Sequence, residues 1–141
     1  MKYFLLLLLA APTVDRVGFP EGYREKLRVL RTSEKTDKQE VKVIYGNEAA
    51  AAAKDGVYPY GSLLVMESRK AGAVTGLHVM RKERGFGEAY GPNRTGEWEY
   101  TEYKPDGSYI TPPQKSEACA TCHVKAGAAK DFVYGAGSAS R

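Results

Sequence analysis

The five residues Cys119-Ala120-Thr121-Cys122-His123 form the pattern C-x-x-C-H near the C-terminal end of the chain. The chain has only two cysteines and two histidines, and this pattern holds both cysteines and one histidine. Two thiols three positions apart on a helical turn can each add to a vinyl group of haem, and the next histidine can bind the iron. The pattern predicts one covalently attached haem c, joined to Cys119 and Cys122, with His123 as the proximal iron ligand.

Two other interpretations of the pattern are a redox dithiol and half of a zinc site. A redox dithiol is expected within a thioredoxin-like βαβ unit, and a structural zinc ion needs four ligands. The chain offers one further histidine, His78, and no further cysteine, so a closed zinc site would need carboxylates. We therefore favour haem attachment over both.

Length and composition indicate one globular domain. The chain has 141 residues, of which 43% are hydrophobic and 27% charged, values within the ordinary range for globular proteins. The net charge is +4, because 21 basic residues are interspersed with 17 acidic ones. No dense basic run is interleaved with aromatic residues, which disfavours nucleic-acid binding. The positive balance favours an acidic redox partner protein instead.

Residues 1–11 resemble a signal peptide, with Lys2 followed by five leucines and two alanines. The apolar run is shorter than the roughly 20 residues of a membrane-spanning helix. Because Pro12 follows Ala11, the cleavage position is poorly defined, and a retained membrane-surface anchor or a buried strand stay as alternatives. Haem is attached to C-x-x-C-H outside the cytoplasm, so both features predict a periplasmic or extracytoplasmic location.

The middle of the chain alternates apolar and polar residues with the period of β-strands. The pattern predicts four strands and, after a turn at 105–107, a short fifth one: 40–45, 62–68, 73–82, 97–103 and 108–110. The links between them are short, so we expect antiparallel pairing.

Short helices are predicted on either side of these strands. Tyr23, Leu27 and Leu30 recur at helical spacing, which predicts a helix from about residue 19 to 31 and a solvated loop after it. Asn47 and Ser116 are expected to cap a helix in the alanine run and the haem-binding helix. The fold class is therefore α+β, with an antiparallel sheet of about five strands, short flanking helices and the haem-binding helix near the C-terminus.

Several stretches resemble the cytochrome P-460 and cytochrome c′-beta family. They are Phe19-Pro20-Glu21-Gly22-Tyr23-Arg24-Glu25, Val43-Ile44-Tyr45, Gly61-Ser62-Leu63-Leu64-Val65-Met66-Glu67, Trp98, and C-x-x-C-H followed by Asp131-Phe132-Val133. The resemblance covers roughly residues 19–134. Residues 135–141 follow the last apolar patch and are expected to be a flexible tail. The resemblance implies an antiparallel sheet, a homodimer, and a haem with histidine on one side and an open distal side. Small ligands such as NO, CO or hydroxylamine-like molecules would bind there.

The family's P-460 branch oxidises hydroxylamine and carries a lysine cross-linked to the haem. By the local match that lysine falls at Met66, and Lys70 lies four residues away, so the cross-linking residue is absent at this position. The cytochrome c′-beta branch also lacks it and binds gases. The resemblance therefore leaves open whether this chain is an oxidoreductase acting on hydroxylamine or NO, with a cross-link from another residue, or only a ligand-binding protein.

Met66 is the residue that we expect to line the haem pocket on the distal side. Its thioether is also a candidate distal iron ligand, and His123/Met66 ligation would make the protein an electron-transfer cytochrome. Met80 carries the same ambiguity, and His78 is expected to be a surface or hydrogen-bonded histidine rather than a second ligand. Four carboxylates are candidate distal proton acceptors, although most should be solvated: Glu67, Glu99, Glu102 and Asp131.

Overall fold

The computed structural model describes residues 11–135. The predicted signal peptide at 1–11 and the predicted flexible tail at 135–141 lie outside the described residues, apart from Ala11 and Gly135. Within the described part of the chain, no helix is both long and apolar enough to cross a membrane.

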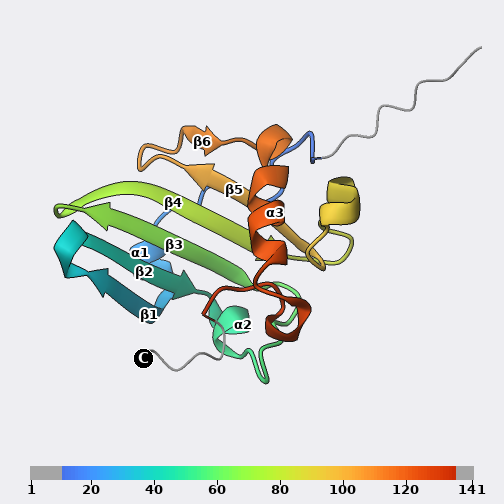
Figure 1. Cartoon of the computed structure of the whole chain (residues 1–141), viewed down its shortest axis with the longest axis horizontal. Helices are drawn as coiled ribbons and strands as arrows, with labels where there is room; N and C mark the ends of the chain where they lie inside the picture. The colour runs from blue at the N-terminus through green and yellow to red at the C-terminus, as the bar shows by residue number, and fades with distance from the viewer. Residues whose placement is uncertain (1–10, 136–141) are drawn as a thin grey trace, which may run out of the picture.

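One antiparallel sheet of six strands forms the centre of the molecule, with its strands in sequence order from β1 to β6 (Figure 1). The strands are β1 (Arg28–Lys35), β2 (Glu40–Gly46), β3 (Leu63–Lys70), β4 (Ala73–Lys82), β5 (Trp98–Tyr103) and β6 (Tyr109–Thr111). The predicted α+β class, the antiparallel pairing and five strands of the prediction are confirmed.

The sixth strand, β1, corrects the prediction of a helix from about residue 19 to 31. The helix α1 covers only Tyr23–Lys26, and the chain then turns into β1, which pairs with β2 and includes much of the expected loop. Val29 and Thr32 are β-branched, and pairing with β2 satisfies the backbone of this segment. Tertiary pairing therefore outweighs the helical spacing of Tyr23, Leu27 and Leu30.

The remaining helices are short and lie between strands or after β6. They are α2 (Glu48–Ala51), α3 (Glu117–Val124), and the 3-10 segments η1 (Thr36–Lys38), η2 (Glu88–Asn93), η3 (Pro113–Lys115) and η4 (Ala128–Lys130). Asn47 caps α2 as predicted, because its side-chain oxygen accepts a hydrogen bond from the backbone N–H of Ala50 at 3.0 Å.

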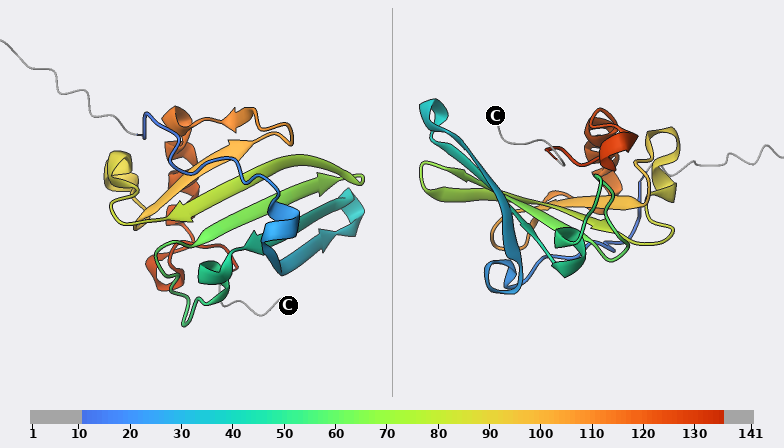
Figure 2. Two further views of the ribbon diagram at one scale, coloured as in Figure 1. Left: turned by 180° about the vertical axis from the view of Figure 1, so that it is seen from behind. Right: turned by 90° about the horizontal axis from the view of Figure 1, so that it is seen from below.

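The two faces of the sheet carry separate apolar clusters. On the face that α3 covers, the buried residues include Leu64, Met80, Tyr90, Trp98, Tyr100 and Ala120. The other face buries Val43, Tyr45, Val65, Leu77, Val79 and Tyr103, and α1 and residues 17–22 lie over it (Figure 2). This division follows the predicted alternation in β3, β4 and β5.

The β1–β2 hairpin curls toward the face of the sheet that carries α3, as the right-hand view of Figure 2 shows. The same sheet face is therefore bounded by α3 on one side and by this hairpin on the other. This arrangement positions the candidate site described next.

Candidate haem-binding site

Helix α3 presents the C-x-x-C-H motif beside the sheet. Ser116 precedes α3 as predicted but does not cap it, because its buried hydroxyl donates to the carbonyl oxygen of Pro113 at 2.7 Å and pairs with the hydroxyl of Tyr90 at 2.8 Å. These contacts fix the start of the helix against η2. Cys119 and Cys122 follow one helical turn apart, so their side chains lie on the same side of α3.

Both thiols are free, which haem attachment requires. Cys122 is exposed, whereas Cys119 is half-buried, with its Sγ 3.8 Å from a carboxylate oxygen of Glu102. Burial, together with the nearby Glu102 charge, raises the pKa of the Cys119 thiol to about 12. In the folded chain Cys119 is therefore a neutral thiol rather than a thiolate.

His123 is held between two tyrosine rings. Its ring centroid lies 4.6 Å from that of Tyr100, which is buried beneath it, and 5.3 Å from that of Tyr134. Its Nδ1 lies 2.7 Å from the carbonyl oxygen of Phe132. A carbonyl oxygen can only accept, so Nδ1 carries the proton and Nε2 keeps the lone pair that a metal would use.

The environment of His123 also keeps its imidazole neutral. Burial lowers the pKa of His123, and the hydrogen bond to Phe132 offsets this only in part. A neutral imidazole with a fixed tautomer is the form that binds iron. The ring is thus prepared to be a ligand by groups of the chain itself.

The segment that supplies the Phe132 carbonyl is held firmly to the sheet. Asp131 and Phe132 both have positive φ angles, 49° and 58°, which non-glycine residues adopt only when the surroundings enforce them. A carboxylate oxygen of Asp131 accepts hydrogen bonds from Lys82 Nζ at 2.7 Å and from the Tyr58 backbone N–H at 3.0 Å. Trp98 Nε1 donates to the Asp131 carbonyl at 2.9 Å. These bonds stabilise the turn that aims the Phe132 carbonyl at His123.

A cavity of about 560 Å³ lies between α3, the 131–134 segment and the sheet. Its volume is within the range of pockets that bind cofactors and other small molecules. The cavity is lined by both motif cysteines, His123, and residues from all six strands: Arg31, Ser33, Lys35, Lys42, Ile44, Leu64, Met66, His78, Met80, Tyr100, Glu102 and Thr111. Two thiols, a neutral imidazole and a largely apolar cavity fit a haem c.

One cross-strand row of side chains crosses the sheet beneath this cavity. Strand register places Ile44, Met66, His78 and Glu102 next to one another in β2 to β5. Met66 is half-buried and lines the cavity, and Met80 lines it as well. Whether either sulfur binds iron stays a prediction.

His78 is hydrogen-bonded, as expected, and it also lines the cavity. Its Nδ1 lies 3.1 Å from Glu102 Oε1, and this bond holds the pKa of Glu102 below its ordinary value against the effect of burial. The alternation in β4 and β5 was the signal that could have placed His78 and Glu102 together. The pair supplies the cavity with a carboxylate and an imidazole at the end nearest Cys119.

The other three candidate carboxylates do not line the cavity. Glu67 is fully buried on the opposite face, where Arg24 Nε donates to it at 2.9 Å and Tyr23 and Arg69 also bond to it. Glu99 is buried and accepts a hydrogen bond from the exposed Arg16, and Asp131 serves the turn described above. All three carboxylates are buried and hydrogen-bonded within the fold, which corrects the expectation that most of them are solvated.

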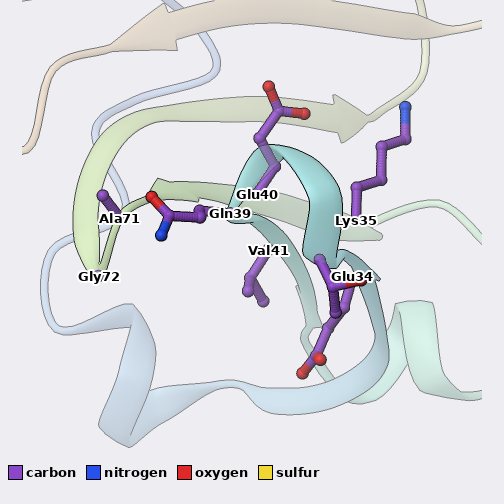
Figure 3. A pocket seen from close by; sticks show the side chains of 8 residues that line it. Glu34, Lys35, Gln39, Glu40, Val41, Ala71 and Gly72 are labelled. Atoms are coloured by element: carbon purple, nitrogen blue, oxygen red, sulfur yellow. The ribbon is translucent and has the colours of Figure 1, made fainter.

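The rest of the described structure shows no second candidate binding site of comparable chemistry. Figure 3 shows a shallow hollow at the ends of the β1–β2 and β3–β4 hairpins, lined by residues such as Glu34, Gln39 and Gly72, away from the motif. Within residues 11–135, no group of three or more His, Cys, Asp and Glu side chains is placed to hold a metal ion. The motif helix follows an antiparallel sheet, which is not the βαβ setting of a redox dithiol.

Comparison with known proteins agrees with this geometry. The model of the family described as Cytochrome P460 matches residues 20–135. That span contains all six strands, the three motif residues, and the turn that carries Phe132. A search of curated proteins found no match.

Proposed function

Because the chain belongs to the cytochrome P460 family, a family of haem proteins, we propose that it binds small molecules at a covalently attached haem c. The observation that carries the proposal is the state of His123, whose Nδ1–H is bound to Phe132 and whose Nε2 is free beside two free thiols. Cys119 and Cys122 would hold the haem and His123 would be its proximal ligand. The haem supplies an iron centre that takes diatomic or hydroxylamine-like ligands.

The chain's own residues determine what reaches the distal side. We infer that the distal side faces the sheet row that contains Met66 and His78, since this row lies across the cavity from α3. Met66 stands where the P-460 branch has its cross-linking lysine. With no cross-link from this position, the haem would be joined to the chain only through the thioethers of Cys119 and Cys122. Binding of NO, CO or hydroxylamine-like ligands is therefore the primary function we propose, and nitrogen-oxide redox activity is a secondary one.

Electron transfer is the second candidate function, and the exposure of Met66 to the cavity favours it. A thioether at the iron opposite His123 would raise the reduction potential and close the distal side. Met66 is unbranched and flexible, so its presence in the cavity fits an apolar wall equally well. We give ligand binding priority because His78 and Glu102 place polar groups on the same wall.

We further propose that the protein works outside the cytoplasm, with the N-terminal sequence directing export and haem attachment following it. The family resemblance supports a homodimer, and the net charge of +4 supports an acidic redox partner protein. Both would act through surfaces outside the haem cavity.

Optical and electron-paramagnetic-resonance spectra of the purified haem protein test this proposal. Ligand binding predicts high-spin iron in both the ferric and the ferrous protein. The ferrous iron should bind CO and NO without first losing a protein ligand. Low-spin iron with a thioether charge-transfer band that is abolished in Met66→Ala would contradict ligand binding as the primary function and would support electron transfer instead. A haem-peptide with a third covalent bond would instead support an oxidising enzyme.

A further inference from the structure

The charged residues of the haem cavity are distributed unevenly. Three cations, Arg31, Lys35 and Lys42, line the side formed by the β1–β2 hairpin. The only acidic residue of the lining, Glu102, lies on the opposite side beside Cys119. One end of the cavity is therefore positive, and it is the end farthest from the two thiols.

The strand register fixes how far these cations lie from the attachment point. Arg31 is paired with Ile44 and so continues the row of Met66, His78 and Glu102, while Lys42 is opposite Ser33 in the next row. Three inter-strand spacings separate β5 from β2, which holds Lys42, and four separate it from β1, which holds Arg31, so the two distances are roughly 14 and 19 Å. These distances are comparable to the width of a porphyrin with its side chains.

The two best-placed cations have unused hydrogen-bonding capacity. Among the described residues, the side chain of Lys42 has no hydrogen-bond or ion-pair partner. Arg31 donates from Nη1 to the carbonyl oxygen of Gly135 at 3.1 Å, and its guanidinium has further N–H donors. Lys35 lies opposite Glu40 and both side chains point to the same side of the hairpin (Figure 3), so the charge of Glu40 partly offsets that of Lys35.

The chemistry of haem supplies carboxylates at the matching distance. The two vinyl groups lie on one edge of the porphyrin and the two propionates on the opposite edge, so thioether bonds formed near β5 would direct the propionates toward the β1–β2 hairpin. Arginine binds a carboxylate through two parallel N–H donors, and lysine binds it as a point charge. We propose that Arg31 and Lys42, supported by Lys35, bind the haem propionates and thereby set the orientation of the haem over the sheet.

This assignment rests on the proposed haem attachment and adds two consequences of its own. The propionates join the hairpin to the haem, so the strand that the sequence failed to predict becomes part of the cofactor site. The cations also disfavour the ferric state, which carries one more positive charge than the ferrous state. Their presence therefore raises the reduction potential of the haem.

The test uses the mature haem protein with Arg31→Gln, Lys42→Gln and the double variant, and Lys54→Gln as a control. Lys54 is exposed and does not line the cavity, so the control removes the same charge elsewhere. The measurements are the midpoint potential and the propionate bending bands in the resonance Raman spectrum. Circular dichroism confirms that each variant is folded.

The proposal predicts a lower potential and shifted propionate bands in both single variants, a larger effect in the double variant, and wild-type values in Lys54→Gln. Recovery of most of the wild-type potential in Arg31→Lys, with its charge kept, would support a charge effect. Folded variants with wild-type potentials and propionate bands would overturn the proposal and assign the cations to an acidic partner protein. Wild-type protein without covalent haem would overturn the proposed function instead.

Discussion

The Nδ1 atom of His123 donates a hydrogen bond to the carbonyl oxygen of Phe132, nine residues later in the chain, across 2.7 Å. This bond connects the motif helix to the turn at 131–134 and selects the tautomer in which Nε2 is available. The hydrogen bonds of Asp131 and Trp98 hold the turn in place. The sheet thus fixes the direction of the proximal ligand through a short backbone segment.

Asp131→Ala should therefore disturb the haem as well as the fold. Loss of the bonds from Lys82 and the Tyr58 N–H should lower the free energy of unfolding by about 2 kcal/mol, since both partners would stay poorly hydrated. The freed turn would weaken the Phe132 bond to His123 and shift the reduction potential. Asp131→Asn keeps an acceptor oxygen and tolerates positive φ, so most of both effects should be recovered. A wild-type potential in folded Asp131→Ala would contradict the positioning role.

The two thiols of the folded, haem-free chain should differ in reactivity. Burial raises the pKa of Cys119 to about 12, whereas Cys122 is exposed, and only a thiolate reacts readily. Iodoacetamide at neutral pH should modify Cys122 at least tenfold faster, as peptide mass spectrometry can measure. In denaturant the two rates should converge. Equal rates in the folded protein would show that Cys119 is not shielded.

Met66→Ala should leave the iron spin state unchanged if this side chain is a wall of the cavity. Because Met66 is half-buried, its truncation should cost about 1 kcal/mol of unfolding free energy, below the range for fully buried residues. The affinity for CO should change by less than about tenfold. Met66→Leu keeps the volume and serves as the control. Conversion from low-spin to high-spin iron in both variants would identify Met66 as the distal ligand.

Glu67 should make the fold sensitive to acid. Burial alone would raise the pKa of Glu67, but hydrogen bonds from Arg24, Tyr23 and Arg69 outweigh it and hold the pKa below its ordinary value. The stabilisation is therefore complete above the unfolded-state pKa and is lost as pH falls through the lower folded-state pKa. In urea unfolding, Glu67→Gln should lose roughly 2 kcal/mol at neutral pH, and this loss should shrink as the pH is lowered below the unfolded-state pKa. The loss at neutral pH is less than for a fully buried pair, because 49% of the Arg24 side chain is exposed.

Glu48→Gln provides the surface control for that experiment. Glu48 pairs with Arg28 at 2.9 Å, but 85% and 59% of the two side chains are exposed. Exposed ion pairs contribute about 0.5 kcal/mol or less in most cases. A loss in Glu48→Gln as large as that in Glu67→Gln would contradict the assignment of the effect to burial.

The sequence predicted the strands whose two faces lie in different surroundings. In β3, β4 and β5, successive side chains enter the two apolar clusters in turn, and this alternation is visible in the residue order. β1 lacks it, because nearly all of its residues are exposed, and Leu30 continues the helical spacing of Tyr23 and Leu27, which precede the strand. Such an edge strand is specified by its partner β2 rather than by its own pattern.

The candidate site also contains residues that the sequence could identify and others that it could not. Cys119, Cys122 and His123 were identifiable because they are adjacent in the chain, and Met66 because strand alternation gave its face. The Phe132 carbonyl could not be predicted, since any residue provides one and only the turn at 131–134 aims it. Arg31 was out of reach for another reason, because its segment was expected to be a helix.

Covalent haem attachment at Cys119 and Cys122 can be measured from the mass of the purified protein after denaturation. The wild-type chain should keep one haem through denaturation and acid extraction, with a pyridine haemochrome spectrum of two thioether bonds. The Cys119→Ala/Cys122→Ala variant should release all of its haem under the same treatment. Wild-type protein that emerges without haem, or a double variant that retains it, would contradict haem attachment at this motif.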